Sequence, residues 1–208
     1  RSLGIDSRAD GIVLVNHGKD EGNYALSKVN DDGTWHLYIH DISTGTAGSY
    51  EQDPIAFAYI PKTDTSLISG RCDAAGNILL YSASSPQFPV QKMAQTGRYT
   101  LTMNRYAATN VVLIISPEGG GQYNLDNIVV YQINPGGLSF EIQTRDTPNN
   151  GLQSPFANVN GAQVPEPVCS FVFIPKATTP KIVVAPTANV VTYETPNAYY
   201  VTNSYTNS

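Results

Sequence analysis

The chain has little charge and no long apolar run. Only 14% of its 208 residues are charged, well below the roughly 25% that is usual in soluble domains. No apolar run approaches the roughly 20 residues of a transmembrane helix. The 12 Lys and Arg residues are scattered along an acidic chain of net charge −5, whereas nucleic-acid binding needs clustered cations. We therefore expect neither a nucleic-acid partner nor a membrane span.

Cysteine is scarce, with Cys72 and Cys169 only. Two cysteines are too few for a zinc site by themselves, but they can join in one disulfide across a long loop. The alternative is that Cys169 acts as a small buried hydrophobic residue, because it takes the place of Ile55 in an internal repeat. The sequence leaves the redox state of the pair open.

Motifs of catalysis and metal binding are also lacking. The sequence has no Gly-x-Ser-x-Gly elbow and no His-Glu-x-x-His pair. His36 and His40 share a strand face, but about 13 Å of strand separates them, too far to ligate one ion together at about 2 Å. The loops 17–22 and 118–126 hold carboxylates among glycines without a periodic calcium motif. We expect a protein that is not an enzyme and has no cofactor; calcium binding stays open.

What the chain does contain is a repeated stretch of β-strand chemistry. Residues 54–62, Pro-Ile-Ala-Phe-Ala-Tyr-Ile-Pro-Lys, return 114 positions later as residues 168–176, Val-Cys-Ser-Phe-Val-Phe-Ile-Pro-Lys. Upstream of each copy lie an aliphatic run, a strand ending in Asn, a turn, and an alternating strand ending in Asp. These segments are 12–15, 23–30, 31–33 and 35–41 in the first copy, and 111–115, 127–134, 135–137 and 140–146 in the second.

Alternation and turn chemistry predict strands throughout the chain. The predicted strands are 11–16, 23–29, 34–40, 54–60, 66–69, 77–84, 89–93, 98–104, 109–116, 127–133, 138–144, 168–174, 181–185, 188–193 and 198–202. The best helical candidate is one turn near 90–95. Residues 54–60 are apolar on both faces, which predicts a central, covered strand.

These patterns predict an all-β fold of two related antiparallel sandwich halves, jelly-roll-like, in one compact unit. The halves are 1–62 and 63–176, with the second repeat copy at 109–176, and we expect them to share sheets. Residues 177–208 form a strand-forming C-terminal extension rich in Tyr, Asn and Thr.

Tyrosines and histidines suggest a binding surface. On the strand 34–40, Trp35, Leu37 and Ile39 point to the core, while His36, Tyr38 and His40 point to solvent. Exposed Tyr beside Asn and Gln suits protein interfaces and sugar platforms alike. The candidate ligand platform is Tyr38, His36, His40 and Tyr123.

Two resemblances bear on the kind of protein. The phrases Asn23-Tyr-Ala-Leu-Ser, Asp32-Gly-Thr-Trp, Gln52-Asp-Pro-Ile-Ala-Phe, Ser84-Ser-Pro-Gln-Phe and Ile115-Ser-Pro-Glu-Gly-Gly resemble β-rich modules of uncharacterised bacterial exported and surface proteins, over roughly residues 11–176. More loosely, Gly76-Asn-Ile-Leu-Leu, Phe88-Pro-Val, Gly97-Arg-Tyr-Thr-Leu, Asn110-Val-Val-Leu-Ile, Ser139-Phe-Glu-Ile and Ser170-Phe-Val-Phe-Ile resemble phage tail-fibre β-modules. The resemblance implies an extracellular, β-rich part of something larger, and carries no catalytic residue.

The leading hypothesis is a non-enzymatic structural protein outside the cell: the subunit of a surface fibre, a layer or a virion appendage. It would self-assemble into a homo-oligomer or filament by β-strand addition. The candidate assembly residues lie in the C-terminal tail: Val184, Val190, Val191, Tyr193, Tyr199, Tyr200 and Val201. The alternative is a carbohydrate-binding or adhesive module that recognises glycans through exposed Tyr and Asn.

Overall fold

The structure is a computed structural model. It describes residues 4–18, 22–41, 50–64, 66–82, 88–119, 127–146 and 151–176, and the backbone alone of 181–184, 190–194 and 199–202. The chain divides into two compact units, Arg1–Ile174 and Pro175–Ser208, and each has sheets of its own.

The larger unit is built of antiparallel strands, which confirms the all-β prediction. They are β1 Gly11–His17, β2 Asn23–Val29, β3 Trp35–Asp41, β4 Ile55–Pro61, β5 Ile68–Asp73, β6 Ile78–Tyr81, β7 Val90–Lys92, β8 Arg98–Thr102, β9 Val111–Pro117, β10 Asn127–Ile133, β11 Ser139–Asp146, β12 Phe156–Val159, β13 Ala162–Pro165 and β14 Pro167–Pro175. Among the described residues, helix is limited to the 3-10 turn Ala108–Asn110. The helical turn predicted near 90–95 is wrong, because Val90–Lys92 pair with β8 and Val90 packs against the core.

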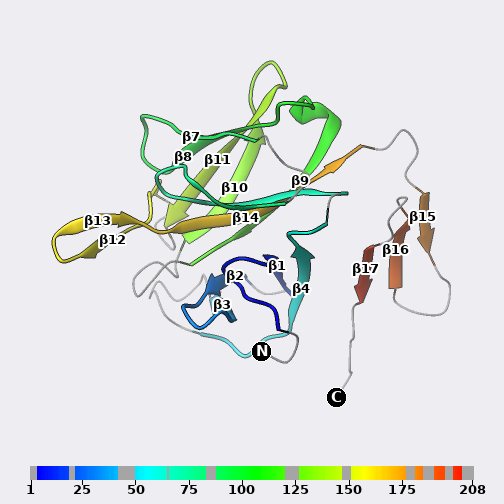
Figure 1. Cartoon of the computed structure of the whole chain (residues 1–208), viewed down its shortest axis with the longest axis horizontal. Helices are drawn as coiled ribbons and strands as arrows, with labels where there is room; N and C mark the ends of the chain where they lie inside the picture. The colour runs from blue at the N-terminus through cyan, green and yellow to red at the C-terminus, as the bar shows by residue number, and fades with distance from the viewer. Residues whose placement is uncertain are drawn as a thin grey trace. The chain divides into compact units, whose positions relative to one another are not determined.

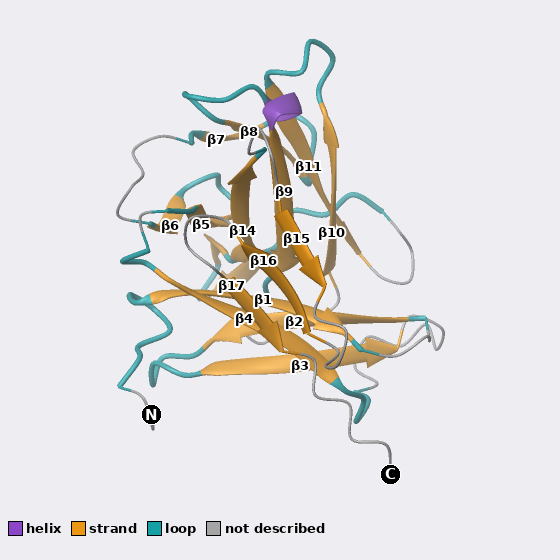
Figure 2. Cartoon of the chain, turned by 90° about the vertical axis from the view of Figure 1, so that its right-hand side faces the viewer, coloured by secondary structure: helices purple, strands orange, loops and turns teal. Residues whose placement is uncertain are grey.

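Two four-stranded sheets pack face to face and enclose the main hydrophobic core. The β11 sheet has the order β10-β11-β8-β7 (Figure 1), and the β14 sheet has the order β6-β5-β14-β9 (Figure 2). The core draws buried aromatic rings from both sheets and from the segment before β7: Phe88, Tyr99, Phe140, Phe171 and Phe173. Phe171 meets Phe88 edge-on at 4.9 Å between ring centroids, a favourable geometry for aromatic pairs.

The first part of the chain forms two small sheets, β1–β4 and β2–β3. Figure 2 shows β2 and β3 running crosswise to β9 and β10. The strands of this part pair only among themselves within the described residues, apart from one bridge between Ser27 and Glu118. The Gly119 N–H strengthens that bridge by donating to the Ser27 carbonyl at 2.8 Å. The halves were predicted to share sheets. Among the described residues, a single bridge at the end of β9 joins the strands of one half to those of the other.

The two repeat copies have the same strand pairing. In the first copy β1 pairs with β4 and β2 pairs with β3; in the second, β9 neighbours β14 and β10 pairs with β11. Even the hairpin turns match. The Asn30 side-chain amide donates to the Thr34 hydroxyl at 3.0 Å, and Asn134 donates to Ser139 at 2.8 Å. Each copy therefore consists of a hairpin whose two flanking strands, the first and the last of the copy, lie side by side in another sheet.

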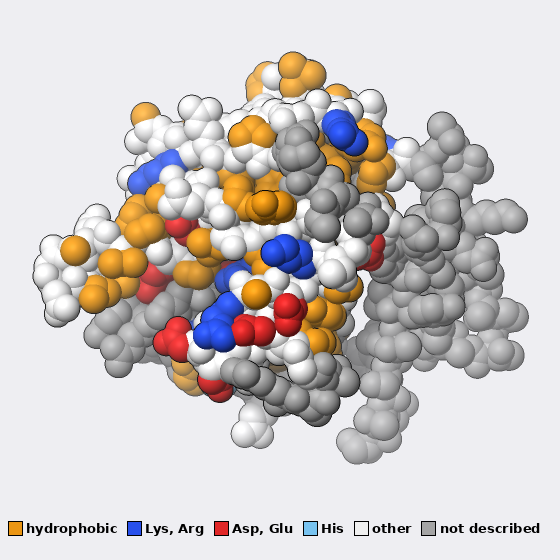
Figure 3. Space-filling model, in the orientation of Figure 1, with side chains coloured by type: hydrophobic (Ala, Val, Ile, Leu, Met, Phe, Trp, Pro, Cys, Tyr) orange, Lys and Arg blue, Asp and Glu red, His pale blue; other side chains and the backbone are white. Residues whose placement is uncertain are grey.

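The second copy carries an extra hairpin that the strand prediction missed. β12 and β13 are joined by Asn160 and Gly161, which have φ values of 51° and 84°. Two consecutive positive φ angles define the type I′ turn, and Asn-Gly is its preferred sequence. The hairpin projects from the body in Figure 1, and Figure 3 shows hydrophobic side chains along it; they include the exposed Val159 and Val164.

The smaller unit is a three-stranded antiparallel sheet, β15-β16-β17. Its strands are β15 Lys181–Val184, β16 Val190–Glu194 and β17 Tyr199–Thr202. All seven predicted assembly residues of the tail lie on these strands, and their side chains fall outside the described residues. Because β16 is central, β15 and β17 are the edges of this sheet.

Candidate functional site

The two copies of the repeated strand lie in opposite environments. β14 is central in its sheet, with β9 on one side and β5 on the other. β4 pairs with β1 alone among the described strands. Phe171 of β14 is fully buried at 0% exposure, while its counterpart in β4, Phe57, is 65% exposed. The prediction of a covered, central strand at residues 54–60 is therefore wrong for residues 55–58, which lie at an open edge among the described strands. Their repeat counterparts in β14 are covered on both sides.

Backbone alternation identifies which groups of β4 face that edge. The Gly18 N–H donates to the Pro54 carbonyl at 2.9 Å, and the Lys62 N–H donates to the Asp10 carbonyl at 2.7 Å. Both β4-side residues are even-numbered, so the even residues of β4 bond to β1. In an antiparallel ladder the intervening residues point their N–H and C=O groups the other way. Ile55, Phe57 and Tyr59 therefore direct their backbone groups outward.

The same alternation holds in β14, where the outward groups have a partner. The Val168 carbonyl accepts a hydrogen bond from the Glu118 N–H at 3.0 Å on the β9 side. Cys169, Phe171 and Phe173 then face β5, and their register partners are Cys72, Gly70 and Ile68. These three residues are the repeat counterparts of Ile55, Phe57 and Tyr59. In the second copy β5 pairs with this side of β14. In the first copy no described strand pairs with the corresponding side of β4.

The open edge lacks the features with which sheets normally discourage pairing. Natural edge strands carry Lys, inward charges, bulges or interior prolines. β4 reads Ile-Ala-Phe-Ala-Tyr-Ile-Pro, with no charge and its only proline at the last residue. Its pairing with β1 runs without a register shift over seven residues. β4 is thus a straight, uncharged edge that offers an apolar side chain, Phe57, to solvent.

A second candidate site is the aromatic stripe, which we define as Tyr24, His36, Tyr38, His40 and Tyr50. Tyr24 and His40 are stacked at 5.3 Å between centroids, and His40 and Tyr50 lie 4.7 Å apart. Tyr50 also contacts Tyr38 at 5.5 Å. The stripe brings together three of the four predicted platform residues and adds Tyr24 and Tyr50; Tyr123 lies outside the described residues.

The stripe is less exposed than the sequence predicts. His40, predicted to face solvent, is buried at 3% exposure, whereas Tyr50 is 58% exposed. Burial lowers the pKa of His40, because a charged imidazolium loses hydration in an apolar site. Desolvation and the neighbouring Tyr50 raise the pKa of Tyr38. Trp35, predicted to be a core residue, is only partly buried and rests edge-on against Tyr59.

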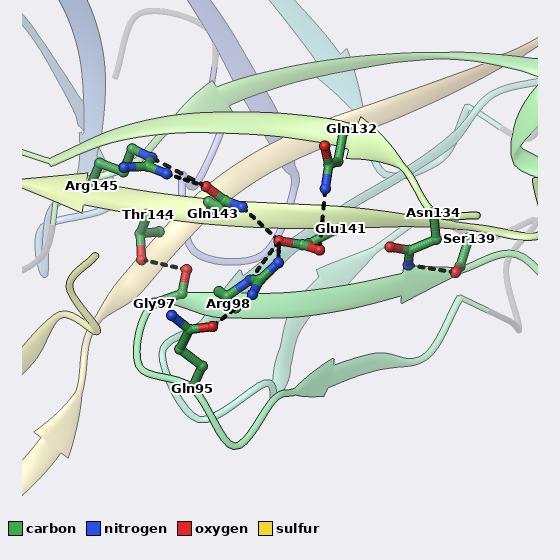
Figure 4. Close-up of polar contacts among 10 residues, drawn as sticks. All are labelled: Gln95, Gly97, Arg98, Gln132, Asn134, Ser139, Glu141, Gln143, Thr144 and Arg145. Atoms are coloured by element: carbon green, nitrogen blue, oxygen red, sulfur yellow. Dashed lines mark hydrogen bonds and ion pairs between the residues drawn. The ribbon is translucent and has the colours of Figure 1, made fainter. Parts of the chain in front are cut away.

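A polar ladder crosses the outer face of the β11 sheet (Figure 4). Glu141 accepts hydrogen bonds from Gln143 and from Arg98, each at 2.6 Å, and Arg145 donates to Gln143 at 2.6 Å. Bonds from Gln143 and Arg98 lower the pKa of Glu141. Since the Arg98 guanidinium bonds to the Glu141 carboxylate, the ladder cross-links β8 and β11 on this face.

A polar cluster around Asp53 depends on contacts between residues that are distant in the sequence. His17 Nε2 lies 3.1 Å from Asp53 Oδ2, and Asn23 donates to both Asp53 and Glu51 at 2.9 and 3.0 Å. Despite these carboxylates, the described residues form no group of three or more His, Cys, Asp or Glu side chains suited to a metal ion.

Deeper in the body, Arg71 and Glu118 form a buried two-pronged ion pair with Nη2–Oε2 at 2.7 Å, and Ser170 also hydrogen-bonds to Glu118. Burial by itself would lower the pKa of Arg71, but the adjacent Glu118 carboxylate outweighs burial and raises it. This pair spans β5 and the segment after β9, so it is a structural link.

The two cysteines face each other across β5 and β14. Their Sγ atoms lie 3.5 Å apart as buried free thiols. The hydrogen bond with Cys72, together with complete burial, raises the pKa of Cys169 well above its ordinary value. A thiol held neutral in this way is a poor nucleophile, which disfavours a nucleophilic role for Cys169.

Within the described residues, no helix is long and apolar enough to cross a membrane. Comparison of the chain with protein-family models, with curated proteins and with solved structures finds no match in any of the three.

Proposed function

We propose that the protein is a non-enzymatic structural subunit that assembles with copies of itself by β-strand addition, outside the cell or on a virion or cell surface. The observation that supports assembly is the contrast between β4 and β14. The two copies of the repeat differ here: β14 has a partner strand on its second side, whereas β4 has none among the described strands. A strand from another molecule at the open edge of β4 would supply the hydrogen bonds that β5 supplies to β14.

The incoming strand comes, in this proposal, from the C-terminal sheet of a second copy. The edges of that sheet are β15 and β17. β15 begins with Lys181, and an edge lysine disfavours pairing, whereas β17 reads Tyr-Tyr-Val-Thr without charge. We therefore assign β17 as the donor. Donor and acceptor are different surfaces, so the contact is head-to-tail and propagates into a ring or a filament.

Two variants of the 208-residue chain test this assignment. Phe57→Lys places a charge on the acceptor edge, and Val201→Lys places one on the donor strand. Leu138→Lys is the matched control, because Leu138 is 68% exposed in the turn between β10 and β11 and belongs to neither β4 nor β17. Wild type and control should form oligomers or filaments in sedimentation velocity and negative-stain images, and each edge variant alone should be monomeric.

Mixing the two edge variants makes the test specific. The Phe57→Lys protein retains an intact β17 and the Val201→Lys protein retains an intact β4, so one junction remains available. The expected product is a one-to-one dimer that grows no further. Assembly of either edge variant alone, or a wild type that stays monomeric at every concentration, would contradict the proposal.

A further inference from the structure

The aromatic stripe contains a buried polar atom without a hydrogen bond to the described chain. His40 Nε2 is buried and has no hydrogen-bond partner among the described residues. Leaving a buried polar group unpaired is costly, so such groups are usually satisfied by protein, water or ligand. The orphan atom lies among the rings of Tyr24, Tyr38 and Tyr50, which together form an amphipathic surface.

The stripe is assembled from three neighbouring chain segments. Tyr24 lies directly opposite His40 in the β2–β3 ladder. Tyr50 lies opposite His40 on the other side, through an isolated antiparallel bridge, and the adjacent Glu51 N–H donates to the Ile39 carbonyl at 3.1 Å. His40 is therefore the middle ring of a three-segment ladder. A ladder fixed by backbone pairing presents its rings in one preset geometry.

Tyr50 forms the solvent-exposed side of the ladder. Its ring is the exposed member of the ladder and lies 4.7 Å from the ring of His40. Exposed side chains exchange rotamers within nanoseconds, so Tyr50 can turn aside and admit a ligand group to Nε2. The ligand ring would then pack against Tyr38 and against the displaced ring of Tyr50.

We infer that the aromatic stripe is a binding site for a neutral saccharide. The Tyr rings offer flat apolar faces with polar rims, the usual lining of a site with few but well-placed polar groups. A sugar hydroxyl can donate or accept a hydrogen bond, so it pairs with Nε2 in either histidine tautomer. Lys28 lies directly opposite His36 in the β2–β3 ladder, but both register partners of His40, Tyr24 and Tyr50, are uncharged, which favours an uncharged sugar at Nε2. This inference does not depend on strand addition, because none of the stripe residues belongs to β4 or β17.

A proline-rich peptide is the competing ligand, since such peptides also dock on aromatic grooves. Proline residues lack an N–H and offer only carbonyl acceptors. They can therefore pair with Nε2 only when it carries the proton. The hydroxyl group is the better match.

The test uses the 208-residue chain and an array of neutral oligosaccharides of glucose, galactose, mannose and N-acetylglucosamine, with calorimetry on each oligosaccharide that binds. Tyr50→Ala removes the exposed ring, and His40→Phe keeps a ring but removes the nitrogen. Tyr106→Ala removes an exposed tyrosine outside the stripe and serves as the control. Both stripe variants should bind about ten-fold more weakly, equivalent to one lost contact of about 1.4 kcal/mol, and the control should bind as wild type does.

A second readout needs no substitution at the buried position. The ¹⁵N shift of His40 Nε2 in the wild-type protein should move on saturation with the best oligosaccharide, because the nitrogen gains a hydrogen bond. The inference is overturned if no neutral oligosaccharide binds, if a proline decamer binds in its place, or if binding leaves both the His40 signal and the variant affinities unchanged.

Discussion

Alanine at Phe57 and at Phe171 compares the two repeat copies directly. The residues are sequence counterparts, but Phe171 is fully buried and Phe57 is 65% exposed. Truncating a buried Phe typically costs about 3–5 kcal/mol, and Phe171 packs on Phe88 and Phe173 at 4.9 and 5.5 Å. A surface substitution away from special features usually changes stability by less than about 0.5 kcal/mol. In the monomer we therefore expect a large loss for Phe171→Ala and almost none for Phe57→Ala.

In the assembly, burial of the Phe57 side chain should strengthen the association of the copies. Full burial of a Phe side chain is worth about 1.5–3 kcal/mol. With 65% of the residue still exposed in the single chain, covering it by a partner strand contributes roughly 1–2 kcal/mol. That corresponds to about a 5- to 30-fold weaker association constant per contact for Phe57→Ala. Phe57→Leu should lose less, since most of the apolar surface remains.

The assay is urea unfolding followed by fluorescence of Trp35, whose ring lies 5.6 Å from that of Tyr59 on β4. It is run at a protein concentration where sedimentation shows monomer, and association is measured separately by dilution. If Phe57→Ala costs more than about 2 kcal/mol in the monomer, the ring is covered within its own chain, and the reasoning from the open edge fails.

Three other perturbations test the packing and the charges. Gly70→Val should destabilise the protein by about 1–3 kcal/mol through overpacking, because a Cβ at Gly70 would lie 2.5 Å from Phe88 Cζ; denaturant unfolding measures this, and an unchanged midpoint would contradict it. Arg71→Met should cost about 3–5 kcal/mol by leaving Glu118 buried and unpaired; Arg71→Met with Glu118→Leu should recover much of that loss in the same assay, and failure to recover would contradict a simple ion pair. His40 has a folded-state pKa below its ordinary value of 6.5, so the unfolded chain binds more protons and stability falls as pH drops through 6.5. His40→Phe should lack this part of the pH dependence, and parallel stability–pH curves for the two proteins would refute it.

Local patterns predicted most of the strands but not which edges are open. Alternation and turn residues identify the hairpins Asn23–Val29 with Trp35–Asp41 and Asn127–Ile133 with Ser139–Asp146. Residues 55–60 are apolar on both faces, which normally indicates a covered strand. Coverage depends on a neighbour such as β5, however, and nothing in β4 itself records whether that neighbour is present.

The candidate sites depend on contacts between distant residues. Alternation placed His36, Tyr38 and His40 on one face, as the ring contacts show. Tyr50 joins them only through a bridge to His40, and Arg71 meets Glu118 across 47 positions. Such pairs depend on register and sheet order, which one sequence does not encode locally. The β12–β13 hairpin did leave a signal, Asn160-Gly161, but its strands are too short for alternation to reveal.

Residue-resolved hydrogen exchange, measured across a range of protein concentrations, tests the central claim most directly. The amides of Cys169, Phe171 and Phe173 should be protected at every concentration, because β5 pairs with them in the single chain. The amides of Ile55, Phe57 and Tyr59 should exchange fast in the monomer and become protected as the protein assembles. If those three amides exchange equally fast in monomer and assembly, β4 is not where copies join, and assembly by strand addition at this edge is wrong.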